Sequence, residues 1–226
     1  MRRLLYVPII HMEPDLGREA ATIDSQSASL FGEKRWAKHK NNVAKFWDSI
    51  ADYFATVDTS NLKIYQDGLP TDGALGRKII EEGAKRGSKN YQIVLSLMVR
   101  GAEIRKTENP SLLKEEYEHI TGLTHSSSVA EKAIAYSRYK LRKDQLTKER
   151  DKFIAKMVNE TLKEGETGVL FIGSYHNILC YLPKDIVVKQ VKDREKINAY
   201  FSQLVSGGDQ ERFEQLAEYL ASPCVH

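Results

Sequence analysis

The chain has 226 residues, of which 41% are hydrophobic and 29% are charged, and its 34 basic and 31 acidic side chains give a net charge of +3. These proportions are those of a soluble globular protein with enough residues for a substantial core. So balanced a charge does not by itself indicate a nucleic-acid partner. Two cysteines do not suggest a disulfide framework, and no apolar run approaches the roughly 20 residues that span a bilayer. We therefore expect a cytoplasmic protein with no membrane partner, and the sequence leaves the oligomeric state open.

The first predicted strand covers residues 4–10, an unbroken apolar run. Pro8 cannot donate a ladder hydrogen bond, which favours a sheet edge or a bulge at this point. The loop that follows places His11, Glu13 and Asp15 at alternate positions, as possible metal ligands or acid–base groups. Residues 25–32 look polar and irregular, and the apolar spacing over residues 33–57 predicts an amphipathic helix.

A glycine-rich loop follows the second predicted strand, residues 62–66. It contains Gly68, Gly73 and Gly76 and leads into a helix predicted over residues 75–85. Backbone N–H groups at such a helix start can hold an anion, which makes these glycines candidate ligand-binding residues. The spacing matches neither the P-loop nor the dinucleotide fingerprint, and glycines that merely let the chain turn are the alternative.

Residues 90–163 are predicted to form a helical insertion or cap. Asn90 is expected to cap its first helix, Asn109 and Pro110 mark the start of the next, and residues 129–163 form an unusually long helix. The middle of this long helix, residues 138–152, is densely charged and mostly basic. Nucleic-acid contact is one interpretation, and a solvated helix face is the other.

The most informative stretch is the apolar run over residues 168–172, which predicts a strand buried on both faces at the centre of a parallel sheet. Gly173 ends this strand, and Ser174 can cap a short helix that ends before Pro183. His176 would then lie in the first helical turn. The helix N-terminus disfavours an imidazolium there, so we expect a neutral ring near pH 7.

The order of the elements predicts the fold class. After a fourth strand over residues 185–192 come two amphipathic helices, residues 196–205 and 210–220. We expect one α/β domain over residues 1–226, with a mainly parallel sheet of about four strands flanked by helices.

Polar groups follow three of the predicted strands. The carboxyl ends of parallel strands share one edge, so these groups can converge on a divalent metal such as Mn, Zn or Fe. The candidate metal ligands are His11, Glu13, Asp67 and His176. A metal-bound hydroxide would serve hydrolysis, with Glu13 and His176 as catalytic candidates and Glu108 or Glu116 as general base. Taken singly, each group is as well explained by ordinary packing or a turn.

The sequence Gly173-Ser174-Tyr175-His176 resembles the G-x-x-H motif of the TraB-like, erythromycin-esterase-like and ChaN-like superfamily. The resemblance implies an α/β fold in which strand-end His and Glu residues gather at one active or metal site. His176 matches that motif directly, and His11 with Glu13 resembles the family's other His/Glu motif. The glycine expected before that histidine is absent, since Ile9 and Ile10 stand there.

Three functions follow from these patterns. The first is a metal-dependent hydrolase acting on a small molecule at the carboxyl ends of the strands. The second is a non-catalytic binding or sensor module for an anionic metabolite or nucleotide, which would use the glycine-rich loop. The least favoured is nucleic-acid binding through the long basic helix. The chain has no G-x-S-x-G, HExxH or CxxC motif, which disfavours a serine hydrolase.

Overall fold

A sheet of five parallel strands lies at the centre of the computed structural model, which describes residues 1–15, 20–124 and 129–224. The strands are β1 (Arg2–Ile9), β2 (Leu62–Gln66), β3 (Glu103–Arg105), β4 (Thr167–Gly173) and β5 (Ile186–Gln190). Across the sheet they stand in the order β3-β2-β4-β1-β5. This confirms the predicted α/β fold with a mainly parallel sheet, to which the structure adds β3.

β4 lies in the middle of the sheet, between β1 and β2. Every residue of β4 after Thr167 is buried. A Cβ on Gly168 would lie 2.9 Å from Leu4 and 3.1 Å from Tyr65, so the neighbouring side chains close tightly over the strand. The unbroken apolar run therefore does mark the central strand, because both of its faces are covered.

β1 lies inside the sheet, so Pro8 does not mark an edge strand, although Pro8 itself has no pairing partner on the β5 side. The register with β5 ends at Tyr6, whose carbonyl accepts a hydrogen bond from the N–H of Val191 at 2.9 Å. Pro8 lies beyond that last pair. Its missing N–H therefore costs no hydrogen bond to β5, which is why an interior strand tolerates proline at this position.

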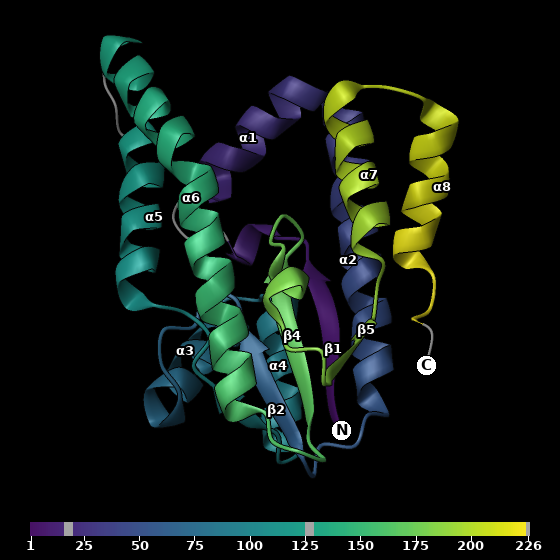
Figure 1. The fold of residues 1–226 in the computed structure, drawn as a ribbon. Coiled ribbons are helices and arrows are strands. Elements are labelled where there is room, and N and C mark those ends of the chain that lie inside the picture. Colours follow the sequence, from purple (N-terminus) through teal and green to yellow (C-terminus); the bar gives the residue numbers. More distant parts are fainter. Residues whose placement is uncertain (16–19, 125–128, 225–226) are drawn as a thin grey trace.

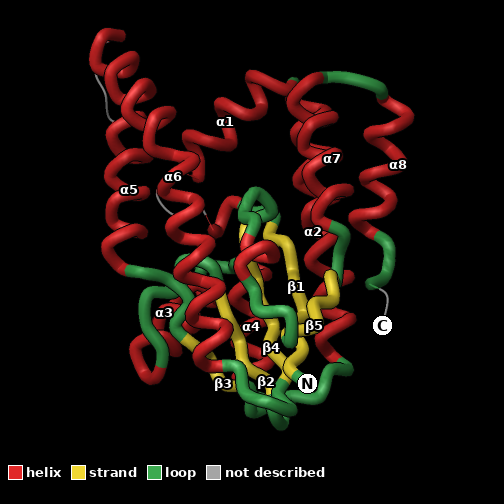
Figure 2. The backbone as a smooth tube through the Cα atoms, viewed as in Figure 1, coloured by secondary structure: helices red, strands yellow, loops and turns green. Residues whose placement is uncertain are grey.

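Helices cover both faces of the sheet (Figure 1). They are α1 (Ala20–Phe31), α2 (Glu33–Ala55), α3 (Gly73–Lys85), α4 (Lys89–Val99), α5 (Pro110–Thr124), α6 (Val129–Thr161), α7 (Arg194–Ser206) and α8 (Gln210–Ala221). Helices α2, α4, α7 and α8 pack on one face, where Trp47 and Tyr200 share a core with Phe171. On the other face, Ile154 and Val158 of α6 pack against Leu170. Figure 2 shows the same layered arrangement of helices around the strands.

After β4 the chain turns to one face of the sheet, whereas after the neighbouring strands β1 and β2 it turns to the other face. After β1 the chain passes through α1 into α2, and after β2 it enters α3. Buried apolar residues of α2 and α3, such as Phe46 and Ile80, belong to the core of the α2 face. After β4 it enters a 3-10 helix, η3 (Ile178–Tyr181), whose Ile178 belongs to the core of the α6 face. A crevice opens at the carboxyl ends of adjacent strands where the chain diverges in this way, and ligands of open α/β sheets bind there.

Three other expectations are corrected. Helix α1 occupies most of the stretch expected to be irregular, residues 25–32, and the segment 90–163 is not entirely helical because it contains β3. Ser88, and not Asn90, caps α4, since its hydroxyl accepts the N–H of Tyr91. The predicted start of α5 is confirmed, because the side chain of Asn109 accepts the N–H of Ser111 at 2.9 Å.

Candidate functional site

A buried arginine on α6 gathers three carboxylates at the carboxyl edge of the sheet. The guanidinium of Arg150 donates to Asp67 at 2.7 Å, to Glu108 at 2.5 Å and to Glu116 at 2.6 Å. Asp67 directly follows β2, Glu108 follows β3 and Glu116 lies on α5. The Arg150 side chain is 2% exposed, so these ion pairs are shielded from water and screened little by salt.

His176 is held in the same cluster by the next residue of α6, Asp151. The imidazole Nδ1 lies 2.5 Å from Oδ1 of Asp151, whose Oδ2 accepts the N–H of Asn177 at 2.9 Å. An ionised carboxylate can only accept, so Nδ1 carries a proton. The opposite ring nitrogen, Nε2, is buried, has no hydrogen-bond partner among the described residues, and lies 3.7 Å from Oδ2 of Asp67. A buried polar atom without a partner calls for an explanation, and sites of chemistry are one.

The ring of His176 lies between two carboxylates, and this reverses the expectation that it is neutral. Burial lowers the pKa of His176, but the hydrogen bond to Asp151 and the charge of Asp67 outweigh that effect and raise the pKa overall. The helix-dipole argument fails because η3 begins only at Ile178, after the histidine. The imidazolium is therefore favoured at a higher pH than in a free histidine.

The carboxylates of this cluster have very different proton affinities. Burial would raise the pKa of Asp67, but His176, Arg150 and the N–H of Gly173 lower it to about 2. Burial raises the pKa of Glu108 to about 7, although Arg150 acts in the opposite direction. Environments that give neighbouring acids such different pKa values are common at sites where protons are transferred. Glu108 can therefore exchange a proton near neutral pH.

Tyr175 and Gly173 separate this charged cluster from an apolar cavity. The Tyr175 ring centroid lies 4.4 Å from that of His176, and 54% of the Tyr175 side chain is exposed. The N–H of Gly173 donates to Oδ2 of Asp67 at 3.0 Å. A Cβ on Gly173 would lie 2.8 Å from the Tyr175 ring, so glycine is what lets this ring lie against the end of β4.

The cavity lies at the carboxyl ends of β1 and β4 and has a volume of about 370 Å³. Its wall includes Ile9 and His11 from the end of β1, and Gly173 and Tyr175 from the end of β4. The volume is within the range of small-molecule sites, roughly 300–1,000 Å³. The cavity therefore occupies the crevice that the strand order predicts for a ligand.

A second cavity, of about 240 Å³, shares His11, Trp36 and His39 with the first. Glu13 and Lys40 also line it. His39 is buried, and burial lowers its pKa to about 4, so this ring is neutral at physiological pH. The two cavities are walled by α1 and α2 on the side away from α6.

The predicted site residues therefore divide into two groups. Asp67 and His176 meet in the buried cluster with Glu108, and Glu116 joins them through Arg150. The other predicted ligands, His11 and Glu13, lie at the cavities instead, where the Nδ1 of His11 is 4.0 Å from Asp15. The residues that the sequence did not single out are Arg150, Asp151 and Tyr175.

These donors do not fit the expected metal centre. Among the described residues, no group of three or more His, Cys, Asp or Glu side chains is arranged to hold a metal ion. One oxygen of Asp67 accepts a hydrogen bond from Arg150 and the other from Gly173. The guanidinium thus supplies the positive charge that a cation would otherwise bring to these carboxylates, and we derive no chemical step through a metal.

The glycine-rich loop is accounted for by its backbone. Gly68 and Gly73 have φ angles of 76° and 59°, which side chains rarely adopt. Gly68 lies in the turn after β2, and Gly73 is the first residue of α3. A Cβ on Gly76 would lie 2.6 Å from the carbonyl oxygen of Thr71. Within the described chain, these three glycines do not line either cavity at the strand ends.

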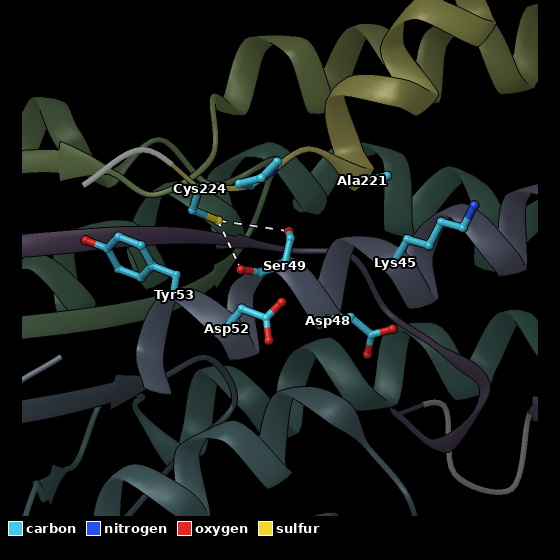
Figure 3. Close-up of a pocket in the computed structure, with 8 residues that line it drawn as sticks. Lys45, Asp48, Ser49, Asp52, Tyr53, Ala221 and Cys224 are labelled. Carbon is cyan, nitrogen blue, oxygen red and sulfur yellow. Dashed lines mark hydrogen bonds between the residues drawn. The ribbon is translucent and has the colours of Figure 1, made fainter. Parts of the chain in front are cut away.

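A further pocket, of about 330 Å³, lies between α2 and the C-terminal segment (Figure 3). The thiol of Cys224 donates to the carbonyl of Ser49 at 3.5 Å. Burial raises the pKa of Cys224, so the thiol stays protonated and is a poor nucleophile. This pocket lies on the helical layer, away from the strand ends, and the described residues that line it include no histidine.

Comparison of the chain with protein-family models, with curated proteins and with solved structures found no match. In the described part of the chain, no helix combines the length and the apolar character needed to cross a membrane.

Proposed function

We propose that this protein is a hydrolase of small molecules in which His176 acts as the general acid and base. The observation that carries the proposal is the buried Nε2 of His176, which lies 3.7 Å from Asp67 and has no hydrogen-bond partner in the described part of the chain. It stands beside the cavity at the sheet's carboxyl edge, separated from it by Tyr175. An imidazole oriented by a carboxylate, with its other nitrogen available, is a recurrent arrangement for proton transfer.

Each group has a defined part in this proposal. Asp151 fixes the orientation of the ring and keeps the proton on Nδ1. The neutral ring of His176 accepts a proton at Nε2 from the attacking water as the new bond to oxygen forms, and the resulting imidazolium then donates that proton to the leaving group as its bond breaks. Asp67 stabilises the imidazolium, and Glu108 exchanges protons near neutral pH. Because His176 is fully buried, substrate reaches Nε2 only when the half-exposed side chain of Tyr175 turns aside.

A panel of ester, amide and phosphoester substrates tests this proposal. We expect turnover by the wild type that persists in the presence of a chelator and is lost in His176→Gln. The control is His119→Gln, because His119 lies on α5 and pairs with Glu115 outside the cluster. Equal turnover by the two variants would refute the assigned role. Turnover that requires added Mn, Zn or Co would instead support the metal-dependent reaction predicted from the His and carboxylate residues at the strand ends.

A non-catalytic binding module is the second candidate, and the complete burial of His176 favours it. In that case the charged cluster only holds α5 and α6 to the strand ends. A compound that raises the melting temperature and is recovered unchanged supports binding, whereas turnover refutes it. The excess of carboxylates near both cavities gives no support to the anionic ligand expected from the glycine-rich loop.

Nucleic-acid binding has the least support in the geometry of α6. Arg150 is buried, and Arg142 is paired with both Glu115 and Glu149. These pairs remove two of the basic groups that suggested phosphate contacts. We expect no retardation of DNA or RNA in a gel-shift experiment at low salt, where phosphate contacts are strongest. The cytoplasmic location and the superfamily resemblance remain predictions.

A further inference from the structure

The cavity beside His176 has walls that define a class of ligand. Its aromatic and aliphatic residues come from the end of β1 and from α1, α2 and α7: Ile9, Ile10, Ile23, Phe31, Trp36, Phe201, Leu204 and Val205. Trp36 stacks on the buried ring of His39 with the ring centroids 4.7 Å apart, and both aromatic rings are part of the wall of the two cavities. Such walls favour a ligand with an apolar, planar body.

The charges around the second cavity favour a ligand without negative charge. Lys40 is the cation on its wall, and its ammonium lies 3.0 Å from Asp24 and 3.9 Å from Glu13. Two carboxylates thus surround one ammonium. Asp24 is further fixed because it accepts a 2.6 Å hydrogen bond from the Trp36 indole. On the part of this wall that the structure describes, an anionic ligand would find no ammonium without a carboxylate partner and would meet the excess of carboxylates.

The geometry points to a site for an uncharged or cationic aromatic molecule, bound between α1, α2 and the ends of β1 and β4. This deepens the proposed function, since it rests on that proposal for placing the reacting bond of the ligand beside Tyr175 and His176. The planar body would lie against Trp36 and His39. Its polar end would lie toward Ser174 and Tyr175, which close the other side of the cavity.

A matched pair of fluorescent probes tests this inference without any need for turnover. Phenylnaphthylamine is uncharged and aromatic, and anilinonaphthalene sulfonate has the same ring system with one added sulfonate. We expect phenylnaphthylamine to bind saturably with one site per chain, and the sulfonate to bind at least tenfold more weakly. Equal or tighter binding of the sulfonate would overturn the inference, as would a failure of phenylnaphthylamine to saturate.

Two tryptophan substitutions locate the probe. Ile23→Trp fills the space shared by the two cavities, because half-buried Ile23 lines both, and should weaken phenylnaphthylamine binding at least tenfold. The control, Ser96→Trp, introduces the same side chain into a separate pocket between α2 and α4 and should leave binding unchanged. Equal effects of the two variants, or no effect of Ile23→Trp, would place the probe elsewhere and overturn the inference.

The outcomes separate this inference from the proposed hydrolase function. If phenylnaphthylamine binds in the cavity but the protein hydrolyses nothing in the substrate panel, the binding site is supported and the hydrolase proposal is refuted. If hydrolysis depends on His176 but the protein does not bind phenylnaphthylamine, the hydrolase proposal is supported and the aromatic binding site is refuted.

Discussion

Replacement of Arg150 by methionine should destabilise the protein severely, because it leaves three carboxylates gathered around an apolar side chain. Asp67 and Glu108 are buried and would lose their bonds to the guanidinium, while Glu116 is partly exposed. Removal of one partner from a buried ion pair costs about 3–5 kcal/mol. In a domain of this size each kcal/mol lowers the melting temperature by about 2–4 °C, so we expect a drop of about 6–20 °C.

The control for this experiment is Arg142→Met. Arg142 lies on the same helix and also bridges two glutamates, Glu115 and Glu149, but these pairs lie at the surface. Exposed ion pairs contribute little, so we expect a small change in stability. Urea unfolding followed by circular dichroism measures both variants. A loss for Arg150→Met as small as that for Arg142→Met would refute the conclusion that the cluster is shielded from water.

The pH dependence of Arg150→Met provides a second readout. Without the guanidinium, the pKa of Glu108 should rise above its present value of about 7, so the folded variant binds a proton that the unfolded chain releases. Stability lost at pH 8 should therefore be partly recovered at pH 5. A loss that is the same at both pH values would show that Glu108 does not respond to Arg150.

Three further predictions concern single residues. Burial raises the folded-state pKa of Glu108 from 4.5 to about 7. The free energy of unfolding should therefore fall by roughly 3 kcal/mol as pH rises from 4.5 to 7. Urea unfolding of Glu108→Gln should not show this fall. Burial lowers the pKa of His39 from 6.5 to about 4. The stability that neutral His39 contributes should therefore be lost as pH falls from 6.5 to 4. In urea unfolding, the stability of His39→Gln should change less over this pH range. Gly173→Ala would place a Cβ 2.8 Å from the ring of Tyr175, and should lower stability by about 1–3 kcal/mol and weaken phenylnaphthylamine binding. The control is Gly83→Ala, whose Cβ would lie 2.6 Å from the Tyr91 ring; it should lower stability but leave phenylnaphthylamine binding unchanged. Equal phenylnaphthylamine binding by the two variants would contradict the conclusion that Gly173 and Tyr175 form part of the cavity wall.

The strands with strong local patterns could be predicted from the sequence. The apolar run of β4 indicated a central parallel strand, and the position of Asp67 and His176 after two strands indicated that they would meet. Parallel topology makes that convergence a geometric consequence. By contrast, β3 has three residues and leaves no periodic pattern to detect.

The long-range partners of the site could not be predicted in the same way. Arg150 and Asp151 lie in the most charged part of a long helix, a pattern that usually indicates a solvated face. Their burial depends on Asp67, which is 83 residues away in sequence, and on His176, which is 25 away. A local pattern cannot distinguish a buried charge from an exposed one, because the distinction depends on partners that only the fold brings together. The expected neutral ring of His176 was based on a helix start at Ser174, whereas the short helix begins only at Ile178.

The protonation of the His176 ring is the measurement that tests this account most directly. A pH titration of the histidine ring nitrogens by NMR, assigned by comparison with His176→Gln, gives both the pKa and the tautomer. The contacts with Asp151 and Asp67 raise the pKa of His176 above its ordinary value of 6.5, with Nδ1 protonated throughout, whereas His39 titrates near 4. A His176 ring that becomes neutral below pH 6.5, or that carries its neutral-state proton on Nε2, would contradict the proposed acid–base site.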